Sequence, residues 1–151
     1  MNDLVGQTAQ DIHYTNTRHN IIIEQGEEFF VYADQDRIGQ VLINLITNAI
    51  KYSPESHDVN IRIWKSAEDR VTVSVKDRGV GIDEADHQNI FKRFYRITEE
   101  EEDTYSGFGI GLFLANEIID RHQGVLEVKS KKGEGSEFSF TLAVTSKNEN
   151  N

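Results

Sequence analysis

Two asparagines four residues apart, Asn44 and Asn48, interrupt an otherwise apolar helical pattern, and Lys51 and Tyr52 follow them. Residues three or four apart share a helix face, so these side chains form a polar stripe beside the apolar one. An amide offers an oxygen that suits a hard cation such as Mg²⁺ and N–H donors that suit phosphate oxygens, and lysine adds positive charge. Asparagines also cap loops or pack against polar backbone, and the helix alone favours that simpler interpretation.

The stretch "DRGVGID" places Asp77 at the end of a predicted strand, with Gly79 and Gly81 directly after it. A carboxylate there can accept a hydrogen bond from an exocyclic amine, and glycines let the backbone approach a flat ring. The alternative is a tight turn in which Asp83 caps a helix.

A second glycine stretch, "GFGIG" at residues 107–111, opens a helical pattern. Free backbone N–H groups at a helix start, together with the positive end of the helix dipole, form an anion site. The stretch lacks the strand-helix-strand context of a dinucleotide-binding fingerprint, and the chain has no G-x-x-x-x-G-K-[ST] loop.

Composition bounds the class of protein. The 151 residues suffice for one domain, and 37% hydrophobic with 28% charged residues is typical of globular proteins. No apolar run is long enough to span a membrane, and the absence of cysteine excludes disulfides and thiolate ligands. A net charge of -10 disfavours binding to nucleic acid or an anionic membrane. We therefore expect a cytoplasmic domain, with the acidic run at 99–103 in a solvated loop.

The elements that position these residues follow from periodicity. Two short stretches separated by Gly26 predict strands over 19–25 and 27–34 joined as a hairpin, and alternation of apolar and polar residues predicts further strands over 59–66 and 70–77. A helix should run from an N-cap at Asp34 to about Tyr52, and a second over 110–124 should close on Gly124. A hairpin over 125–144 turns at 132–135, whereas the first dozen residues are only weakly patterned. We predict an α+β two-layer sandwich over 1–146, a mixed sheet covered on one face by about three helices, with a frayed tail over 147–151.

Four stretches in this order resemble a known family. "DRIGQVLINLITNAIKYSP", "VKDRGVGID", "IFKRFYRI" and "GFGIGLFLANEIIDRHQG" are similar to the N, G1, F and G2 boxes of the ATP-binding catalytic domain of bacterial two-component sensor histidine kinases, in the GHKL superfamily. The resemblance covers nearly the whole chain from Asp3, and four ordered boxes are highly specific. It implies the Bergerat ATP-binding fold with a flexible ATP lid.

The resemblance also implies ATP and Mg²⁺ as cofactors. Asn48 would coordinate Mg²⁺, with Asn44 in the same metal site, and Asp77 would bind the adenine amine in a pocket shaped by Gly79 and Gly81. The remaining implied roles are packing beside adenine for Tyr52, phosphate contacts for Lys51 and Arg96, and lid hinges and phosphate-binding N–H groups for Gly107, Gly109, Gly111 and Leu112. In the predicted lid, residues 92–106, we expect the lowest order without nucleotide, with Phe91 and Phe94 as hydrophobic anchors.

The helix also indicates phosphotransfer rather than hydrolysis. Hydrolysis needs a base for water, which in the resembling ATPases is a glutamate one turn before the metal-binding asparagine. Here that position is Asn44, so the catalytic set implied is Asn44, Lys51 and Arg96. A neutral histidine acceptor is already nucleophilic near pH 7 and needs no such base.

The acceptor is predicted to lie elsewhere. The family's phosphoacceptor motif, H-E-x-[RK]-x-P, is absent, and the five histidines look like surface or loop residues: His13, His19, His57, His87 and His122. We expect one domain of a longer protein, monomeric when isolated and unable to phosphorylate itself. Its expected partners are its own dimerisation domain and a response regulator, and the resemblance leaves open a membrane anchor elsewhere in the parent. Two alternatives remain: a serine kinase of the anti-sigma-factor type, and a nucleotide-dependent interaction module without turnover.

Overall fold

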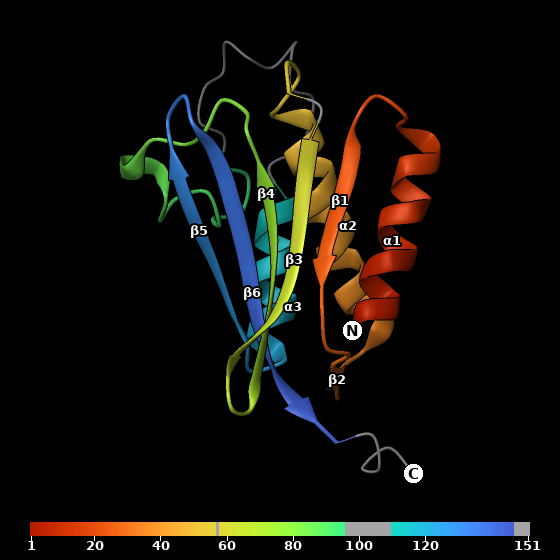
Figure 1. The fold of residues 1–151 in the computed structure, drawn as a ribbon. Helices are drawn as coiled ribbons and strands as arrows, with labels where there is room; N and C mark the ends of the chain where they lie inside the picture. The colour runs from red at the N-terminus through yellow and green to blue at the C-terminus, as the bar shows by residue number, and fades with distance from the viewer. Residues whose placement is uncertain (57, 96–109, 147–151) are drawn as a thin grey trace.

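A computed structural model describes residues 1–56, 58–95 and 110–146 (Figure 1). The helices and strands follow in the order α1 (Asn2–Thr15), β1 (Asn20–Gln25), β2 (Phe30–Val31), α2 (Gln35–Lys51), β3 (Asp58–Ala67), β4 (Arg70–Asp77), the short 3₁₀ helix η1 (Glu84–Asp86), α3 (Gly111–Arg121), β5 (Val125–Lys131) and β6 (Gly135–Thr145). The acidic run at 99–103, most of the predicted lid and the tail at 147–151 lie outside the described residues.

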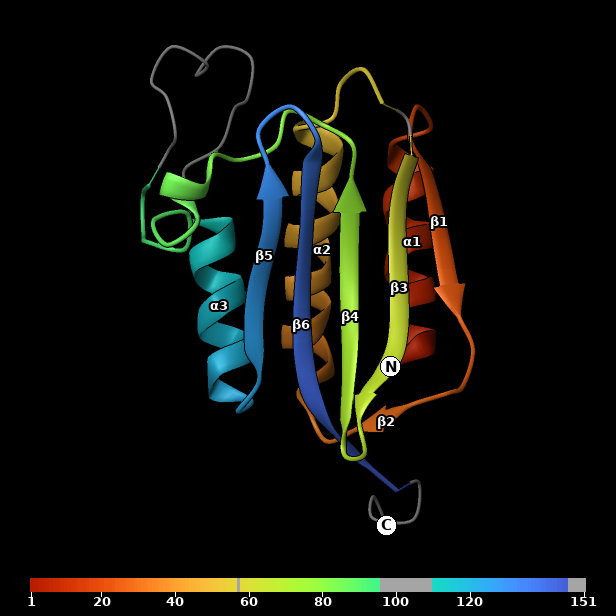
Figure 2. The same ribbon diagram turned by 60° about the vertical axis from the view of Figure 1, so that its left-hand side comes forward.

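The strands form one mixed sheet. Its order is β1-β3-β4-β6-β2, and β5 also pairs with β6. β1 runs parallel to β3, whereas the pairs β3–β4, β4–β6, β5–β6 and β2–β6 are antiparallel. The α-helices pack together on one side of this sheet, and no helix of the described chain covers its other side (Figure 2). The predicted two-layer sandwich with a mixed sheet is therefore confirmed.

The two faces of the sheet differ in polarity because side chains alternate along each strand. On the helix side, Val75 pairs with Phe138 and Ile61 with Val75, and all three side chains are buried. On the opposite side, Glu137 lies between Lys76 and Lys129 in register, so opposite charges face each other across the strands. Such cross-strand pairs let this face remain in water.

Helix α2 supplies the central apolar stripe of the helix layer. The side chain of Asp34 accepts a hydrogen bond from the Arg37 N–H at 3.1 Å and so caps the helix start, as predicted. The stripe recurs at spacings of three and four, which buries one continuous face against the sheet. Its buried members are Ile38, Val41, Leu42, Leu45, Ile46 and Ala49.

Helix α1 had no predicted range, and its pattern explains why. Val5, Ala9 and Ile12 are buried at helical spacing, but the same stripe also contains the polar Thr8. Thr8 is buried and satisfies its hydroxyl by donating to the Leu4 carbonyl at 2.7 Å. A stripe of one alanine, one threonine and two larger residues is too weak to stand out in a polar sequence.

The predicted hairpin at Gly26 is wrong. β1 and β2 do not pair with each other: β1 pairs with β3, and the two-residue β2 pairs with the end of β6. Both segments contain strands, as predicted, but their partners lie far along the chain.

The end of α3 differs in detail from the prediction. The helix stops at Arg121 with His122 as C-cap, and the left-handed residue is Gln123, with φ of 59°, rather than Gly124. Gly124 is required for another reason. A Cβ there would lie 2.3 Å from the Thr141 carbonyl oxygen, so the glycine lets the chain pass close to β6.

Candidate functional site

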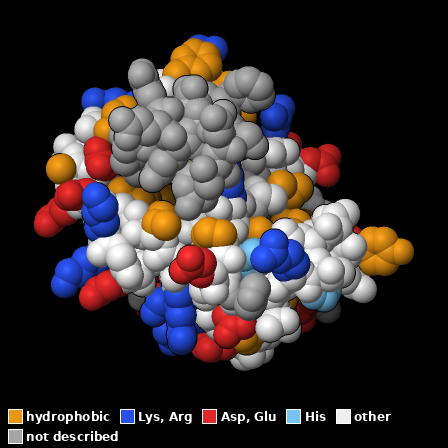
Figure 3. Space-filling view, turned by 90° about the horizontal axis from the view of Figure 1, so that it is seen from above, with side chains coloured by type: hydrophobic (Ala, Val, Ile, Leu, Met, Phe, Trp, Pro, Cys, Tyr) orange, Lys and Arg blue, Asp and Glu red, His pale blue; other side chains and the backbone are white. Residues whose placement is uncertain are grey.

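Three segments meet at the upper end of the molecule in Figure 1: the last turn of α2, the end of β4 with the turn after it, and the β5–β6 turn. The first turn of α3 lies below them, beside the middle of α2, where Asn44 contacts Gly111. On the part of this end that the structure describes, acidic and basic side chains are interspersed (Figure 3). The predicted site residues between Asn44 and Leu112 that are described lie on the second half of α2, at the end of β4 with the turn after it, and on the first turn of α3.

Asn44 joins α2 to the start of α3. Its Nδ2 donates to the Gly111 carbonyl at 3.1 Å, and its Oδ1 accepts from Gln40 Nε2 at 3.1 Å. The simpler interpretation, an amide packed against polar backbone, is therefore confirmed for Asn44. One lone pair of Oδ1 stays open for a second contact.

Asn48 lies one turn further along the same stripe and is half-buried. Within the described residues its side-chain amide has no hydrogen-bond partner, in contrast to that of Asn44. An unengaged amide oxygen on a fixed helix is a suitable ligand for a hard cation or a polar group of a bound molecule.

Lys51 and Tyr52 complete the stripe at the end of α2. The Lys51 ammonium lies 5.3 Å from the centre of the Tyr52 ring, within the range of a cation–π contact. The Tyr52 carbonyl accepts from the Val80 N–H at 3.1 Å. This second bond fixes the end of α2 against the turn after β4, just as Asn44 fixes its middle against α3.

Asp77 ends β4 and is only 4% exposed. Its Oδ1 accepts from the Gly79 N–H at 2.8 Å. Burial raises the pKa of the Asp77 carboxyl above its ordinary value, because a charged carboxylate loses hydration in this position, while the backbone N–H groups of Gly79 and Ser136 partly offset the shift. A buried carboxylate with an upward pKa shift is a frequent feature of functional sites.

Gly79 and Gly81 are each required by close backbone contacts that the sequence did not reveal. A Cβ on Gly79 would lie 1.9 Å from the Tyr52 carbonyl oxygen, and a Cβ on Gly81 would lie 2.0 Å from the Lys131 carbonyl oxygen. Gly81 also has a φ of 69°. Both glycines therefore hold the turn in close contact with α2 on one side and β5 on the other. Asp83 caps η1 by accepting from the Ala85 N–H, so the alternative of a capped turn holds as well.

Among the described residues, no side chain caps the backbone N–H groups in the first turn of α3. Gly111 is its first residue, the N-cap Ile110 makes no side-chain cap, and the first turn has no acidic residue. Uncapped N–H groups with a positive dipole end favour an anion there. The Leu112 side chain packs against the core instead of facing a ligand. The predicted residues Arg96, Gly107 and Gly109 lie outside the described part of the chain.

The segment before residue 96 is anchored by only one of the two predicted phenylalanines. Phe91 packs against the core, edge-on to Phe138 with ring centres 6.3 Å apart. Phe94 is 58% exposed with a φ of 63°, so its prediction as an anchor is wrong. Tyr95 provides the other anchor: its hydroxyl donates to Asp86 Oδ1 at 2.7 Å, and this bond raises the pKa of the phenol.

Two serines beside Asp77 were not predicted. Ser130 Oγ accepts from the Ile82 N–H at 2.7 Å and donates to the Gly135 carbonyl at 2.9 Å. The 2.7 Å contact between the two hydroxyls therefore has Ser136 as donor, since the single proton of Ser130 is already used. Ser136 pairs directly with Asp77 in the sheet, and only knowledge of that register could have found it.

The prediction for His19 needs a correction. It was expected at the surface or in a loop, and it does lie between α1 and β1, but it is only 6% exposed. Nothing in the local sequence distinguishes it from the four other histidines.

The stripe from Asn44 to Tyr52 thus extends over about 12 Å of helix, at roughly 1.5 Å per residue. The anion-favouring end of α3 adjoins one end of it and the buried Asp77 the other. This polar stripe between an anion-favouring helix end and a buried hydrogen-bond acceptor fits the class that the sequence resemblance implies, a nucleotide-binding domain built on an α+β sandwich.

The matches to known proteins agree with this class. Residues 33–146 match the family described as histidine kinase-, DNA gyrase B- and HSP90-like ATPase, and the chain belongs to this family. Sensor histidine kinase WalK of Bacillus subtilis (strain 168) is 40% identical over 116 residues, which are 76% of this chain and 19% of WalK. Adaptive-response sensory kinase SasA of Prochlorococcus marinus is 44% identical over 117 residues, 78% of this chain and 30% of SasA.

Solved structures give the same result. The catalytic domain of histidine kinase ThkA superposes with a TM-score of 0.79 at 30% identity, covering 96% of this chain and 95% of that domain. The predicted resemblance to the ATP-binding domain of sensor histidine kinases is therefore confirmed. The chain spans less than a third of the length of the two curated relatives named. In the described residues, no helix is both long enough and apolar enough to cross a membrane.

Proposed function

We propose that this chain is the ATP-binding catalytic domain of a sensor histidine kinase and transfers the γ-phosphoryl group of ATP to a histidine on a separate dimerisation domain. The observation that carries the proposal is the polar stripe of α2, which two hydrogen bonds, from Asn44 to Gly111 and from Val80 to Tyr52, fix between an anion site and a buried acceptor.

The adenine is placed at the Asp77 end of this stripe. The Asp77 carboxylate accepts from the backbone N–H groups of Gly79 and Ser136, and because each of its two oxygens has two lone pairs, it retains acceptor capacity for the exocyclic amine. Gly81 shapes the same pocket through its positive φ, and the Tyr52 ring packs beside the base. The fixed position of the end of α2 against the Gly79 turn supports this placement.

The phosphates are placed at the other end. The uncapped first turn of α3, beginning at Gly111 and Leu112, supplies backbone N–H donors, and Lys51 is proposed to reach the phosphates with its ammonium group from the Tyr52 end of the stripe. Arg96, Gly107 and Gly109 are proposed to complete this region as the lid, with Arg96 contacting the phosphates.

Mg²⁺ is assigned to Asn48, with Asn44 as a second contact through the remaining lone pair of its oxygen. The unengaged Asn48 amide fits a cation that takes oxygen ligands and shares them with substrate phosphates. The ion would neutralise charge that develops on the transferred group.

Phosphotransfer is favoured over hydrolysis by the position of Asn44. Its amide already donates to Gly111 and accepts from Gln40, and a neutral amide cannot take a proton from water. A histidine acceptor needs no such base, so the work of the site is to position the phosphates and neutralise their charge.

The proposed partners follow from this function. They are the parent's dimerisation domain, which carries the acceptor histidine, and a response regulator downstream. We propose a monomeric, cytoplasmic domain that spans 1–146 and cannot phosphorylate itself when isolated.

A two-step experiment tests the function. First, a non-hydrolysable ATP analogue with Mg²⁺ is titrated into the domain by calorimetry. Then labelled ATP is supplied together with a separate, histidine-bearing dimerisation domain from a relative such as WalK. Acid-labile label on that domain supports the kinase, because a phosphorus–nitrogen bond is hydrolysed by acid. Acid-stable label would instead indicate a serine kinase, and binding without transfer would indicate an interaction module.

A further inference from the structure

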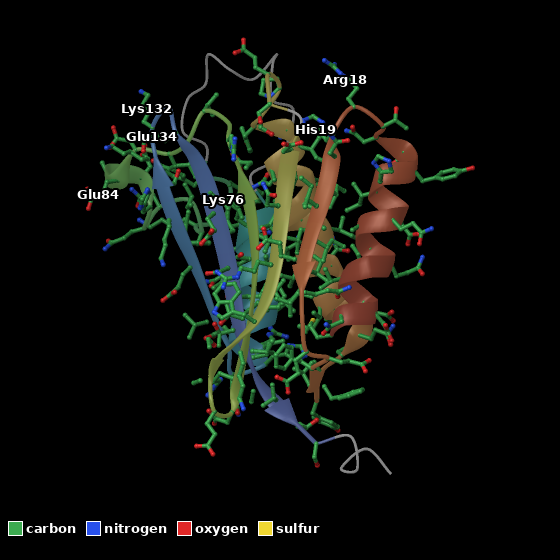
Figure 4. The ribbon with its side chains drawn as sticks, viewed as in Figure 1. Arg18, His19, Lys76, Glu84, Lys132 and Glu134 are labelled. Carbon is green, nitrogen blue, oxygen red and sulfur yellow. The ribbon has the colours of Figure 1, made fainter. Side chains whose placement is uncertain are left out.

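His19 is a buried, titratable residue that the proposed chemistry does not use. Its Nε2 lies 3.1 Å from the Ser53 carbonyl oxygen, and its own carbonyl lies 3.2 Å from His13 Nδ1 in the last turn of α1. Figure 4 places His19 at the upper end of the molecule, in the connection between α1 and β1. The residue therefore links α1 to the segment that follows α2.

Ser53, the acceptor of this bond, is completely buried at the end of α2. It directly follows Lys51 and Tyr52, and its hydroxyl donates back to the Ala49 carbonyl. The next hydrogen bond in the series runs from the Val80 N–H to the Tyr52 carbonyl, at 3.1 Å.

The series continues to the far side of the site. The Val80 carbonyl accepts from the Gly133 N–H, at 2.7 Å, in the β5–β6 turn. Three hydrogen bonds thus connect four segments in a row: the α1–β1 connection, the end of α2, the turn after β4 and the β5–β6 turn. His19 is the first donor of this row and its only side-chain donor.

We infer that His19 is a positioning residue for the nucleotide site: it holds the end of α2, and with it Lys51 and Tyr52, against the Gly79 turn. The inference rests on the proposed function for its effect on nucleotide, but not for its effect on the fold. A Cβ at Gly79 would lie 1.9 Å from the Tyr52 carbonyl oxygen, so the turn and the end of α2 are in close backbone contact. A small shift at the end of α2 therefore changes the pocket directly.

The donor chemistry selects the variants. A carbonyl oxygen can only accept, so His19 Nε2 must carry a proton. In His19→Gln the side-chain nitrogen stands the same number of bonds from the backbone as Nε2 and can still donate to Ser53. In His19→Asn the amide is equally polar but one bond shorter, and it cannot reach. The control for a general loss of stability is Val5→Ala, because Val5 is fully buried and lies in the first half of α1, whereas His19 follows the end of that helix.

The first measurement needs no nucleotide. Amide hydrogen exchange of Val80, read by NMR on the labelled protein, reports how firmly the turn is held to the end of α2. We expect exchange about fivefold faster or more in His19→Asn, and wild-type exchange in His19→Gln. Equal Val80 exchange in wild type and His19→Asn would overturn the inference, as would an equal increase in Val5→Ala at matched stability.

The second measurement is the affinity for the Mg²⁺-bound ATP analogue. We expect His19→Asn to bind about fivefold more weakly or worse, with His19→Gln restored and Val5→Ala near wild type. If the wild type binds the analogue and His19→Asn binds it with the same affinity, the inference is overturned while the proposed function stands. If the wild type itself fails to bind, the proposed function is wrong, and Val80 exchange still decides whether His19 holds α2.

Discussion

The buried carboxylate of Asp77 predicts a stability that depends on pH with a defined sign. Burial raises its pKa in the folded state above the ordinary 3.8. The folded protein therefore keeps this proton at pH values where the unfolded chain has released it. Since the folded state binds more protons, the free energy of unfolding falls as pH rises through this range. Each unit by which burial raises the pKa removes about 1.4 kcal/mol.

The variant Asp77→Asn isolates this contribution because asparagine does not titrate. We expect the difference in free energy of unfolding, wild type minus variant, to decrease as pH rises from below 3.8 and to level off above the raised pKa. Urea unfolding at a series of pH values measures it. A difference that instead grows with pH would refute the reasoning, since it would mean that the fold stabilises the charged form.

The same variant should lose nucleotide. Asparagine has one side-chain oxygen, and if it keeps the 2.8 Å bond from the Gly79 N–H, its NH₂ group faces the adenine amine, donor against donor. A hydrogen bond to a charged group contributes about 1.5–3 kcal/mol, so we expect affinity to fall by about 10- to 150-fold in a calorimetric titration.

The matched control is Asp83→Asn in the same turn, where the carboxylate is exposed and only caps η1. It should bind nucleotide as the wild type does. Unchanged affinity in Asp77→Asn, or an equal loss in Asp83→Asn, would place the adenine elsewhere.

Three further changes test other parts of the structure. Gly79→Ala puts a Cβ 1.9 Å from a backbone oxygen and should lower the free energy of unfolding by about 1–3 kcal/mol or more. The control Gly6→Ala, with open space around it in α1, should raise the free energy of unfolding by about 0.5–1 kcal/mol. Urea unfolding measures both, and equal effects of the two substitutions would contradict the prediction. Asn48→Ala should weaken binding of the analogue about tenfold with Mg²⁺ present but little with chelator, and an equal loss in both conditions would remove Asn48 from the metal site. The pKa of the Tyr95 phenol should lie above the usual value of about 10, because the hydrogen bond to Asp86 favours the protonated form. The ultraviolet titration of the wild type minus that of Tyr95→Phe isolates this phenol, and a transition below the usual pKa would contradict the prediction.

The parts of the fold that local signals specify could be predicted from the sequence. Asp34 caps α2 and Pro54 follows its end, so both boundaries of this helix were predicted within a residue or two. The β3–β4 hairpin and the β5–β6 hairpin have strict alternation and polar turns between neighbouring strands. In each case the residues that determine the structure are close together in the chain.

Partners that lie far apart in the chain could not be predicted. Phe30 in β2 pairs with Thr145, and Asn20 in β1 pairs with Asp58, so a local hairpin was the wrong choice even though both segments are strands. The same limit applies to His19, whose burial depends on contact with Ser53.

For the site, the sequence identified candidate residues better than it explained why each residue is needed. Asp77 and Asn48 were identified as candidates, and the structure places one at the buried end of β4 and the other on the polar stripe of α2, while their roles stay predictions. Gly79 was assigned to a ring contact, but its immediate requirement is contact with the Tyr52 backbone, which only the packed structure reveals. Phe94 failed as an anchor: its side chain is exposed and its backbone is left-handed, a conformation that nothing in the sequence indicates for phenylalanine.

The central position of β6 constrains how the chain can fold as it is synthesised. β6 pairs with every residue of β4 and also with β5 and β2, yet it is the last of the described strands in chain order. Residues 78–145 must be added after β4 is complete, which takes about 3–14 s at roughly 5–20 residues per second. During that time β4 has an open edge, which is a site for pairing with other chains. For these seconds the nascent domain therefore depends on protection from association with other chains. Asp77 can pair with Ser136 only once β6 has been synthesised.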